Sequence, residues 1–547
     1  MTRTPLALQC ACALANRPAA AYHTTMPRIG SSLVLFASSL FAQAVPSTVP
    51  EATNHVSTSR VADVEKFLAA CTKLPHGNLL RITVAGTSHG GRNQPLVHIA
   101  DSTASGARVR VLVIGNIHAG EVEGKEALQV LVREFALGQH RDLLQHCDLQ
   151  FLPIYNADGN EQLGSKNREG QNGPDLAGQR PNGQGLDLNR DFVKADAPET
   201  RTLLGLFRSF DPHVFIDLHT TNGSYHGYHL TFAPCLSTSF DPELQRLSRS
   251  LLDESRAAML SEHHFATFDY GNFETRDWEQ NGAPESPKGA RGWYTYDHRA
   301  RYGINYFGLR NRISILSEAY SYADFATRIA AVRAFVLTLL RRCSDRKAEL
   351  IEQTTAADGR TRNGTGVSLG FESTFAEPES LPILVGEVET IPAADGKPTR
   401  HVRKGDGKPE TMNVCRTFRA RQQRPLPHAW ALLAASPAAI ERLQLHGIEF
   451  TRLEAAGKRR GERFAVSKKR KPKRPYQGHQ ELMLTGSWEA AAELELPVGT
   501  VLVSAQQPLA RLAAVLLEPE SEDSLSTWNF FEANTDSHYP VLRLSAQ

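Results

Sequence analysis

The stretch Gly115-Asn116-Ile117-His118-Ala119-Gly120-Glu121 decides the fold class that we predict for this chain. It follows an apolar run, residues 109–114, and opens an amphipathic segment that reaches about Ala136. A buried strand, a glycine-bearing turn and a helix start are typical of an α/β unit, which binds ligands at the carboxyl ends of its strands. Residues three apart in a first helical turn can point the same way, so His118 and Glu121 are candidates to share a metal ion. A lone His-x-x-Glu motif is weak evidence, because many surface helices carry one by chance.

Two further strand ends carry side chains of the same kind. The apolar run 214–218 ends at His219, and the run 313–317 ends at Glu318. Two histidines, one glutamate and an open fourth position form a catalytic zinc set, and Glu318 would then take a proton from the activated water. The alternative is that His219 merely caps a strand and Glu318 is a solvated loop carboxylate. Each alternative is plausible alone, but three such residues at strand ends favour the metal site.

Two longer motifs lie between these residues in the chain. They are Pro153-Ile154-Tyr155-Asn156-Ala157-Asp158-Gly159 and, the more specific one, Gly185-Leu186-Asp187-Leu188-Asn189-Arg190-Asp191-Phe192. With the histidine and glutamate positions, their order and spacing resemble the zinc carboxypeptidases related to carboxypeptidase A. Residues 84–92 are similar to the opening hairpin of that family, and the resemblance covers roughly residues 79–340. It implies an α/β fold with a mixed, mostly parallel sheet and helices on both faces.

The resemblance assigns the central residues of the site. It implies that His118, Glu121 and His219 hold one Zn²⁺ per chain and that Glu318 is the general base. In this mechanism zinc lowers the pKa of a water molecule and polarises the scissile carbonyl. Glu318 then passes the proton of that water to the leaving amine.

Asn189 and Arg190 match the pair that grips the terminal carboxylate of the substrate. The assignment is chemically sound, because a planar guanidinium binds a carboxylate through two parallel hydrogen bonds. The alternative for Arg190 is a structural salt bridge with Asp187 or Asp191.

An arginine upstream of the Asp-x-Asn-Arg block neutralises the oxyanion in this family. Arg168 and Arg180 both lie in the corresponding loop, and sequence alone does not decide between them. We take Arg168 as the catalytic cation and Arg180 as a substrate-binding residue. The loop between them is rich in Gly, Asn, Gln and Pro, so we expect an irregular surface segment that shapes the cleft.

The family also closes a tyrosine over the bound substrate. Tyr294 and Tyr296 lie in the right region upstream of Glu318, and we take Tyr296 for this role, although either ring could simply pack in the core. His226 and His229 resemble a second metal pair. We expect them to line the cleft or belong to a strand, since the zinc set is complete without them.

Composition supports a globular enzyme with room for two or more domains. The chain has 547 residues, 41% of them hydrophobic and 22% charged. Its 61 basic and 59 acidic residues give a net charge of +2, so nothing indicates a specific nucleic-acid partner. Beyond the N-terminus no apolar run is long enough to predict an integral membrane span.

The N-terminal segment, residues 1–44, is predicted to be a leader. The first acidic residue of the chain is Glu51, and Met26-Pro27-Arg28 precedes the apolar stretch 31–41 and the small-residue site Ala42-Gln43-Ala44. This pattern predicts a secretory signal peptide, with Met26 as a possible true start, and hence export to the periplasm or outside the cell. The alternative is an organelle-targeting transit peptide. Without the leader five widely spaced cysteines remain, and this odd number leaves at least one thiol unpaired within a chain.

We place the catalytic domain at residues 60–345 and an accessory domain at residues 365–547. The charged stretch 341–349 and a loop-rich stretch, residues 354–370, indicate the boundary. The accessory part is predicted to be α+β or mostly β, with strands at 382–385, 430–433 and 500–504. A helix is predicted from Ser436-Pro437 to His446, because serine caps it and proline suits its first position. Nothing in this part looks catalytic.

The accessory part contains a dense basic run, Lys468-Lys469-Arg470-Lys471-Pro472-Lys473-Arg474. Such a run could bind nucleic acid, an anionic cell wall or an acidic membrane surface. The alternative, which we prefer at this point, is a solvated, mobile loop.

These observations predict a zinc-dependent metallocarboxypeptidase that acts on peptides with a free carboxylate. One rival is an N-acyl amino acid deacylase or a cell-wall peptide amidase on the same fold, since those substrates also end in a carboxylate. A rival of another class is a catalytically silent binding protein, but a pure binder has no need of the base Glu318. The oligomeric state is not predicted.

Overall fold

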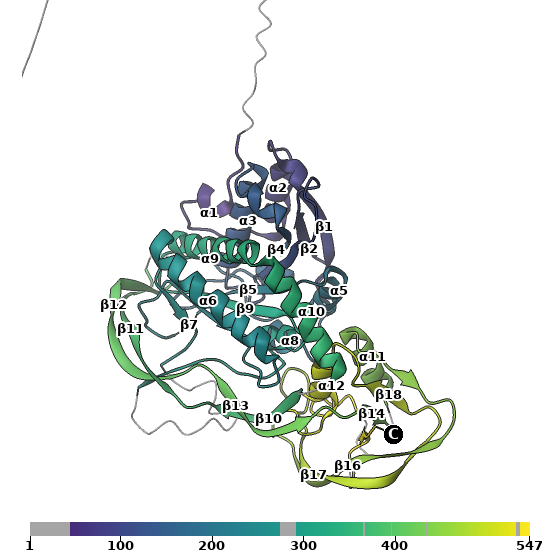
Figure 1. The fold of residues 1–547 in the computed structure, drawn as a ribbon. Helices are drawn as coiled ribbons and strands as arrows, with labels where there is room; N and C mark the ends of the chain where they lie inside the picture. The colour runs from purple at the N-terminus through teal and green to yellow at the C-terminus, as the bar shows by residue number, and fades with distance from the viewer. Residues whose placement is uncertain are drawn as a thin grey trace, which may run out of the picture. The chain divides into compact units, whose positions relative to one another are not determined.

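A mixed eight-stranded sheet forms the centre of the N-terminal two-thirds of the chain in this computed structural model (Figure 1). The structure describes residues 44–221, 223–273, 291–364, 367–394, 397–433, 435–531 and 537–546. Its strands run in the order β1 (Leu80–Thr87), β2 (Asn93–Ile99), β4 (Cys147–Leu152), β3 (Val109–Gly115), β5 (Val214–Thr220), β9 (Ile313–Ala319), β6 (Leu230–Pro234) and β7 (Thr267–Asp269). The four central strands, β4, β3, β5 and β9, are parallel neighbours, so their carboxyl ends meet at one edge.

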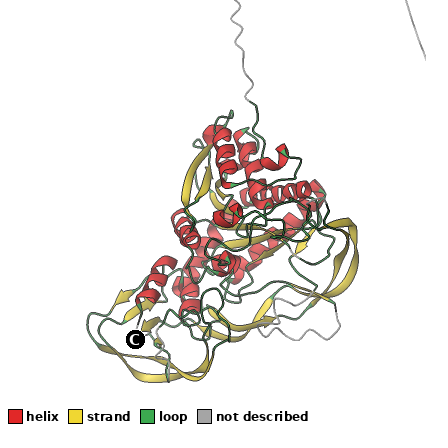
Figure 2. Cartoon of the chain, turned by 180° about the vertical axis from the view of Figure 1, so that it is seen from behind, coloured by secondary structure: helices red, strands yellow, loops and turns green. Residues whose placement is uncertain are grey.

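Helices cover both faces of this sheet, because its central strands are apolar on both sides. In β3 the side chains of Val111 and Val113 enter the core cluster formed with α2 (Val61–Cys71), α3 (Glu123–Ala136), α6 (Pro242–His263), α9 (Phe325–Asp345) and α10 (Lys347–Asn363). Those of Leu112 and Ile114 enter a second cluster with α5 (Pro198–Phe210) and α8 (Gly303–Gly308). Figure 2 shows the layers from behind. The predicted fold class is confirmed.

The C-terminal region is mostly β, as predicted. β10 (Ser368–Phe375) pairs with β13 (Phe418–Pro425), and β11 (Glu379–Ile391) forms a long hairpin with β12 (Arg400–Cys415). β12 also pairs with β8 (Gly292–Tyr294) of the catalytic part. An antiparallel sheet follows, in the order β15 (Thr451–Arg452), β18 (Val501–Ser504), β14 (Ala429–Leu432), β19 (Val541–Leu544), β16 (Gly457–Arg470) and β17 (Met483–Leu496).

Two helices accompany this second sheet, α11 (Pro437–His446) and α12 (Ala510–Leu517). The Ser436 side chain accepts a hydrogen bond from the Ala439 N–H at 3.1 Å, which confirms the predicted start of α11. Both helices pack into the same core cluster as α5 and α8. Residues 45–547 form one compact unit, and the domain limits 60–345 and 365–547 stay a prediction.

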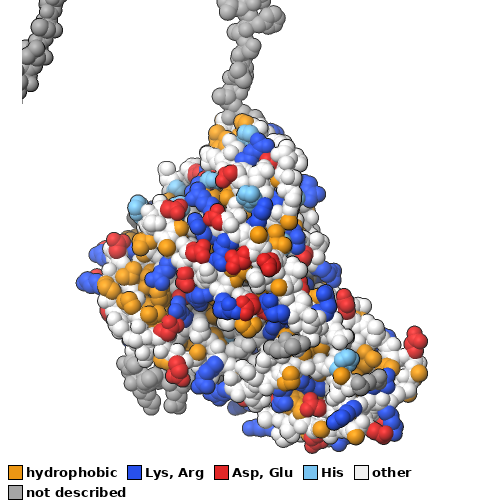
Figure 3. Space-filling model, in the orientation of Figure 1, with side chains coloured by type: hydrophobic (Ala, Val, Ile, Leu, Met, Phe, Trp, Pro, Cys, Tyr) orange, Lys and Arg blue, Asp and Glu red, His pale blue; other side chains and the backbone are white. Residues whose placement is uncertain are grey.

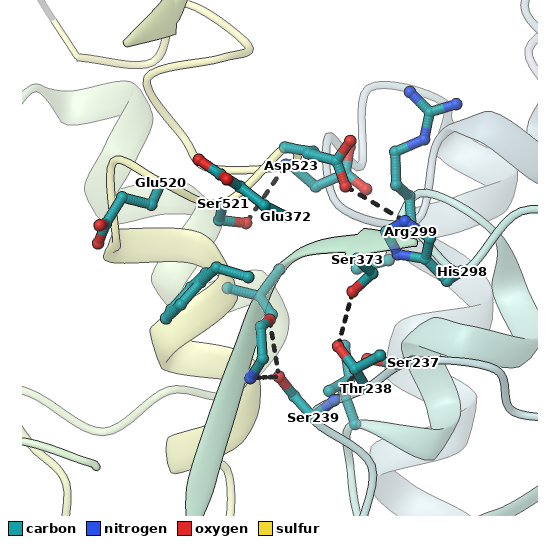
Figure 4. A pocket seen from close by; sticks show the side chains of 16 residues that line it. Ser237, Thr238, Ser239, His298, Arg299, Glu372, Ser373, Glu520, Ser521 and Asp523 are labelled. Atoms are coloured by element: carbon teal, nitrogen blue, oxygen red, sulfur yellow. Dashed lines mark hydrogen bonds and ion pairs between the residues drawn. The ribbon is translucent and has the colours of Figure 1, made fainter. Parts of the chain in front are cut away.

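The junction between the two regions is polar and contains a small cavity (Figure 4). Thr238 is hydrogen bonded to Ser373 there, and Ser239 to the backbone of Gly370 in β10. Beside it, the buried Arg301 binds Asp523 at 2.8 Å. These contacts connect segments that are more than 130 residues apart in the chain.

One local prediction was wrong. Residues 354–370 were expected to be rich in loops, yet α10 continues to Asn363 and ends at Gly364, whose φ of 68° suits only glycine without strain. Its buried residues, Leu350, Thr354, Ala357 and Thr361, recur every three or four positions. This helical period is easily missed, because two of the four are threonines.

Four further predictions concern the leader, membrane spans, the cysteines and the net charge. The leader, residues 1–44, lies outside the described residues except for Ala44. No helix in the described ranges is long and apolar enough to cross a bilayer. The cysteines at 71, 147, 235, 343 and 415 are all free thiols. Basic and acidic side chains are interspersed over the face shown in Figure 3, in keeping with the small net charge.

The buried His446 in α11 should make folding stability depend on pH. Burial lowers its pKa from 6.5 to about 3, and the neutral ring is satisfied by Tyr306 and the Val193 carbonyl. Because the folded-state pKa is lowered, this stability is present above pH 6.5 and is lost as the pH falls. Between pH 7 and pH 5 the loss is about 2 kcal/mol. Urea unfolding of His446→Gln should show a shallower pH dependence by that amount, whereas the exposed control His428→Gln should match wild type; equal slopes in all three would contradict the prediction.

Candidate metal centre and active site

The turn after β3 presents the first two candidate ligands. Asn116 adopts a left-handed conformation (φ 65°), and its side-chain amide donates to the Ala119 carbonyl at 3.1 Å, which stabilises the turn. A Cβ atom at Gly120 would lie 2.7 Å from the Gly178 carbonyl oxygen, so only glycine fits there. α3 begins at Glu123, so His118 and Glu121 lie in this turn and not in the helix itself.

Three buried side chains form the one group in the described residues that could hold a metal ion: His118, Glu121 and His219. One ligand atom from each lies within 4.8 Å of the others. His118 Nδ1 is 3.1 Å from Glu121 Oε1, and His219 Nδ1 is 2.9 Å from Glu121 Oε2. Burial alone would raise the pKa of Glu121, but the charges of His118 and Arg168 hold it well below its usual value.

The outer ring nitrogens of both histidines face carboxylates. His118 Nε2 is 3.0 Å from Asp187 Oδ1, and His219 Nε2 is 2.9 Å from Asp217 Oδ2. A carboxylate behind a histidine keeps the proton on Nε2 and turns the Nδ1 lone pair toward the metal. The donor set therefore fits zinc: two imidazoles and one carboxylate, with Asp187 and Asp217 behind the histidines and Arg168 beside Glu121.

Glu318 stands beside the metal group at the end of β9. It is the register partner of His219 on β5, and its side chain lines the same cavity of 310 Å³. Burial raises the pKa of Glu318 to about 8, with the His219 charge opposing and the Glu121 charge adding to this shift. A carboxyl group at this position, beside the metal group, is placed to exchange a proton with a water molecule in the cavity, as a general base must.

Asn189 and Arg190 enter this cavity from a short 3₁₀ helix, η3 (Leu188–Arg190). The Gly303 N–H donates to Asn189 Oδ1 at 2.9 Å. Because a backbone N–H can only donate, the side-chain oxygen of Asn189 is used and its NH₂ group remains a donor toward the cavity. The Arg190 guanidinium lies 3.9 Å from the Tyr302 ring centroid, and no ion pair within 4.0 Å joins it to any described acidic residue. The alternative salt bridge with Asp187 or Asp191 is therefore not formed.

The two candidate arginines have different surroundings. Arg168 is bound on three sides, at 3.1 Å to Glu121 Oε1 and at 3.0 Å to each of the backbone carbonyls of Thr220 and Thr221, and it does not line the cavity. Arg180 lines the cavity, its side chain is 42% exposed, and Nη1 lies 3.8 Å from Glu121 Oε1. This geometry reverses our preference for Arg168. Arg180 offers the donors that an oxyanion needs, because within the described residues its side chain makes one hydrogen bond, from Nε to Asp187 at 2.9 Å.

The two candidate tyrosines, Tyr294 and Tyr296, also have different surroundings. Tyr296 lines the cavity, and its buried hydroxyl has no hydrogen-bond partner in the described residues. Tyr294 points elsewhere, packing with Phe375. His226 is fully buried, and its Nδ1 accepts from the Tyr228 N–H at 3.2 Å, so it is a core residue and not a metal ligand.

Some functional residues were not predicted. Asp217 had a usable signal, because a residue two positions before His219 on one strand faces the same side. Asp187 belongs to the quoted motif, but its contact with His118 crosses 69 positions. Tyr302 had no local signal.

Sequence comparisons find zinc carboxypeptidases among the known proteins that are similar to this chain. The family model "Zinc carboxypeptidase" matches residues 65–309. Carboxypeptidase 2 of Trichophyton rubrum is 25% identical over 483 residues, covering 84% of this chain and 81% of that protein. Carboxypeptidase D of Homo sapiens is 34% identical over 122 residues, covering 18% of this chain and 9% of that one. A metallo-carboxypeptidase structure from Burkholderia cenocepacia aligns with a TM-score of 0.39 and 16% identity over 51% of this chain and 68% of that one.

The site and the family match define the class, a zinc-dependent hydrolase. The chain matches the zinc carboxypeptidase family over residues 65–309. Glu318 lies nine residues beyond the matched segment, so the structure alone places it in the site.

Asp187 should control zinc affinity although it is not a ligand. Replacing Asp187 by Asn removes the charge that orients His118 and binds Arg180. We expect zinc affinity to fall roughly 10- to 100-fold, the usual cost of losing such a partner. Competition with a chromophoric chelator measures this affinity, and the surface variant Asp211→Asn serves as control. Unchanged affinity in Asp187→Asn would show that this contact does not orient the ligand.

Proposed function

We propose that this enzyme removes single residues from the C-termini of peptides that end in a free carboxylate. One observation carries the proposal: a single cavity brings together the metal group, Glu318 and the donor pair Asn189 and Arg190. A carboxylate held by that pair positions the neighbouring peptide bond, since two fixed points determine the orientation of the chain end.

The residues of the cavity divide the chemistry between them. Zinc, when bound by His118, Glu121 and His219, would activate a water molecule and polarise the scissile carbonyl. Glu318 takes the proton of the water and returns it to the leaving amine, because its carboxyl group lines the cavity beside the metal group. Proton transfer by one group in both directions needs no second acid in the cavity.

Arg180 stabilises the negative charge that develops on the carbonyl oxygen. Its guanidinium faces the cavity beside the metal group, and its charge is fixed because the carboxylates of Asp187 and Glu121 keep its pKa raised despite burial. Tyr296 offers a hydroxyl without a partner to the bound substrate.

The cavity gives one indication of side-chain preference. Asp297 lines it, but the Arg299 side chain binds this carboxylate, with Nε at 2.6 Å. Tyr270, Ile304 and Leu316 form apolar parts of the lining. A paired acid does not attract a basic side chain, so we propose that apolar or aromatic C-terminal residues are preferred over Lys and Arg.

Peptide pairs with free and amidated C-termini test this function. Wild-type protein should release single C-terminal residues from free-ended peptides only, as followed by mass spectrometry. Glu318→Gln should keep its zinc and lose about 10²- to 10⁴-fold in kcat, the contribution of a positioned base. Cleavage of N-acyl amino acids or cell-wall fragments alone would contradict the proposal in favour of those enzymes. Zinc binding without hydrolysis would favour a binding protein.

Substitutions of Arg180 and Arg168 should have different effects on catalysis and on zinc binding. Arg180→Gln should reduce kcat about 10²- to 10³-fold while zinc content stays at one per chain, because it loses an interaction with the developing charge. Arg168→Gln should instead reduce zinc retention and stability, since Arg168 holds Glu121 and two backbone carbonyls. Steady-state kinetics together with metal analysis separates these effects. A purely catalytic defect in Arg168→Gln would restore Arg168 as the catalytic cation.

We also propose that the chain is exported through residues 26–44. The support is the sequence pattern alone: a basic start at Arg28, the apolar stretch 31–41 and the small residues before position 45. N-terminal sequencing of the protein from its native cell should find a new start after Ala44. A mature chain that retains residues 1–44 would contradict export.

A further inference from the structure

The tip of the β16–β17 hairpin, residues 468–482, carries unbalanced positive charge. It holds six Lys and Arg side chains, all in the run 468–474, and one acidic residue, Glu481, which is bound to Arg301 at 3.1 Å. Farther along the same hairpin two cations are paired across the strands, Lys458 with Glu493 at 2.8 Å and Arg463 with Glu489 at 3.6 Å. The basic run therefore differs from the rest of this hairpin in charge.

Two side chains attach the tip to the active site. The Asp187 N–H donates to Gln477 Oε1 at 2.8 Å, and His479 Nε2 lies 2.7 Å from Asp196 Oδ2. Asp187 supports the metal ligand His118, and residues 187–196 include the carboxylate-binding pair on η3. The tip is thus in contact with the segment that builds the substrate site.

The residue between the basic run and these anchors lies close to the cavity. Tyr476 is the chain neighbour of Gln477, which binds the backbone of Asp187 two residues before the cavity residue Asn189. Its ring also lies 5.7 Å from the Arg301 guanidinium. Arg474 is only two residues from Tyr476, so at most about 7 Å of backbone separates them.

The basic run is fixed in place as well as exposed. The Gln480 side chain donates to the Pro472 carbonyl, which holds the run against the anchored part of the tip. Lys471, Lys473 and Arg474 are exposed, and no acidic side chain of the described ranges pairs with them within 4.0 Å. Such cations are available to a ligand.

We infer that this tip is an entrance wall of the active site that favours peptides with acidic residues upstream of the cleaved bond. The inference rests on the proposed carboxypeptidase function. A peptide whose C-terminus sits in the cavity must leave past its rim, and cations held there attract Asp and Glu over a Debye length of about 8 Å at physiological salt. The position beside a peptide-cleaving site favours an acidic peptide over a nucleic acid.

The test uses three peptides with the same C-terminal residues and with Glu, Gln or Lys at the upstream positions. The tip variant combines Lys471→Gln, Lys473→Gln and Arg474→Gln in the full chain. A matched control combines Lys458→Gln, Arg459→Gln and Arg460→Gln, which removes the same charge from the far end of the hairpin. kcat/KM is measured for each peptide in low and high salt.

Wild type and the control should cleave the Glu peptide roughly tenfold faster than the Gln peptide at low salt, with a smaller ratio at high salt. In the tip variant the ratio should approach one through loss on the Glu peptide. The inference would be overturned if the tip variant kept the wild-type ratio, or if wild type cleaved the Glu and Gln peptides equally fast. In either case, cleavage of the Gln peptide would still uphold the carboxypeptidase function. If wild type showed no preference for the Glu peptide but bound an oligonucleotide, and only the tip variant lost that binding, the inference would be overturned in favour of a nucleic-acid site. Failure to cleave any free-ended peptide would overturn both proposals.

Discussion

The site depends on one buried carboxylate. Glu121 lies between the imidazoles of His118 and His219, is bound by Arg168, and accepts the backbone N–H of Thr220 at 3.1 Å. These partners come from the turn after β3, from the loop before η3 and from the end of β5. Arg168 pairs with this carboxylate, and a bound metal ion would add positive charge beside Glu121, Asp187 and Asp217, because buried charges are tolerated only when paired. Metal binding and the assembly of three loops are therefore coupled.

The region after α10 contacts the loops that build the catalytic site. The β11–β12 hairpin contacts the catalytic part through the His401 N–H, which donates to the Gly170 carbonyl at 2.8 Å, and through the Arg403 N–H, which donates to the Tyr322 carbonyl at 2.8 Å. The β16–β17 hairpin contacts Asp187. Both long hairpins thus contact loops of the catalytic site, so the C-terminal region supports that site structurally.

The sequence allowed the central features to be predicted because they are local. The strands β3, β5 and β9 are short apolar runs, and their ends place His118, His219 and Glu318 at one sheet edge whatever the loops do. Asn189 and Arg190 lie in a motif specific enough to be recognised. The sequence could not decide between Arg168 and Arg180, because the answer depends on which guanidinium is already bound, and Thr220 and Thr221 are more than 50 residues from Arg168.

The β16–β17 hairpin was not predicted, for a related reason. β16 and β17 are largely exposed on both sides, so they lack the apolar alternation by which a half-buried strand is recognised. The role of Gln477 could not be predicted at all, since its partner Asp187 is 290 positions away.

The most direct test of the account is X-ray absorption at the zinc edge of the purified, zinc-loaded chain. The account predicts one zinc per chain with two imidazole nitrogens and carboxylate or water oxygens, and no sulfur. The imidazole signal should fall by half in His219→Ala. Sulfur ligands, or a zinc environment that His219→Ala leaves unchanged, would contradict the assignment of the metal centre on which the function rests.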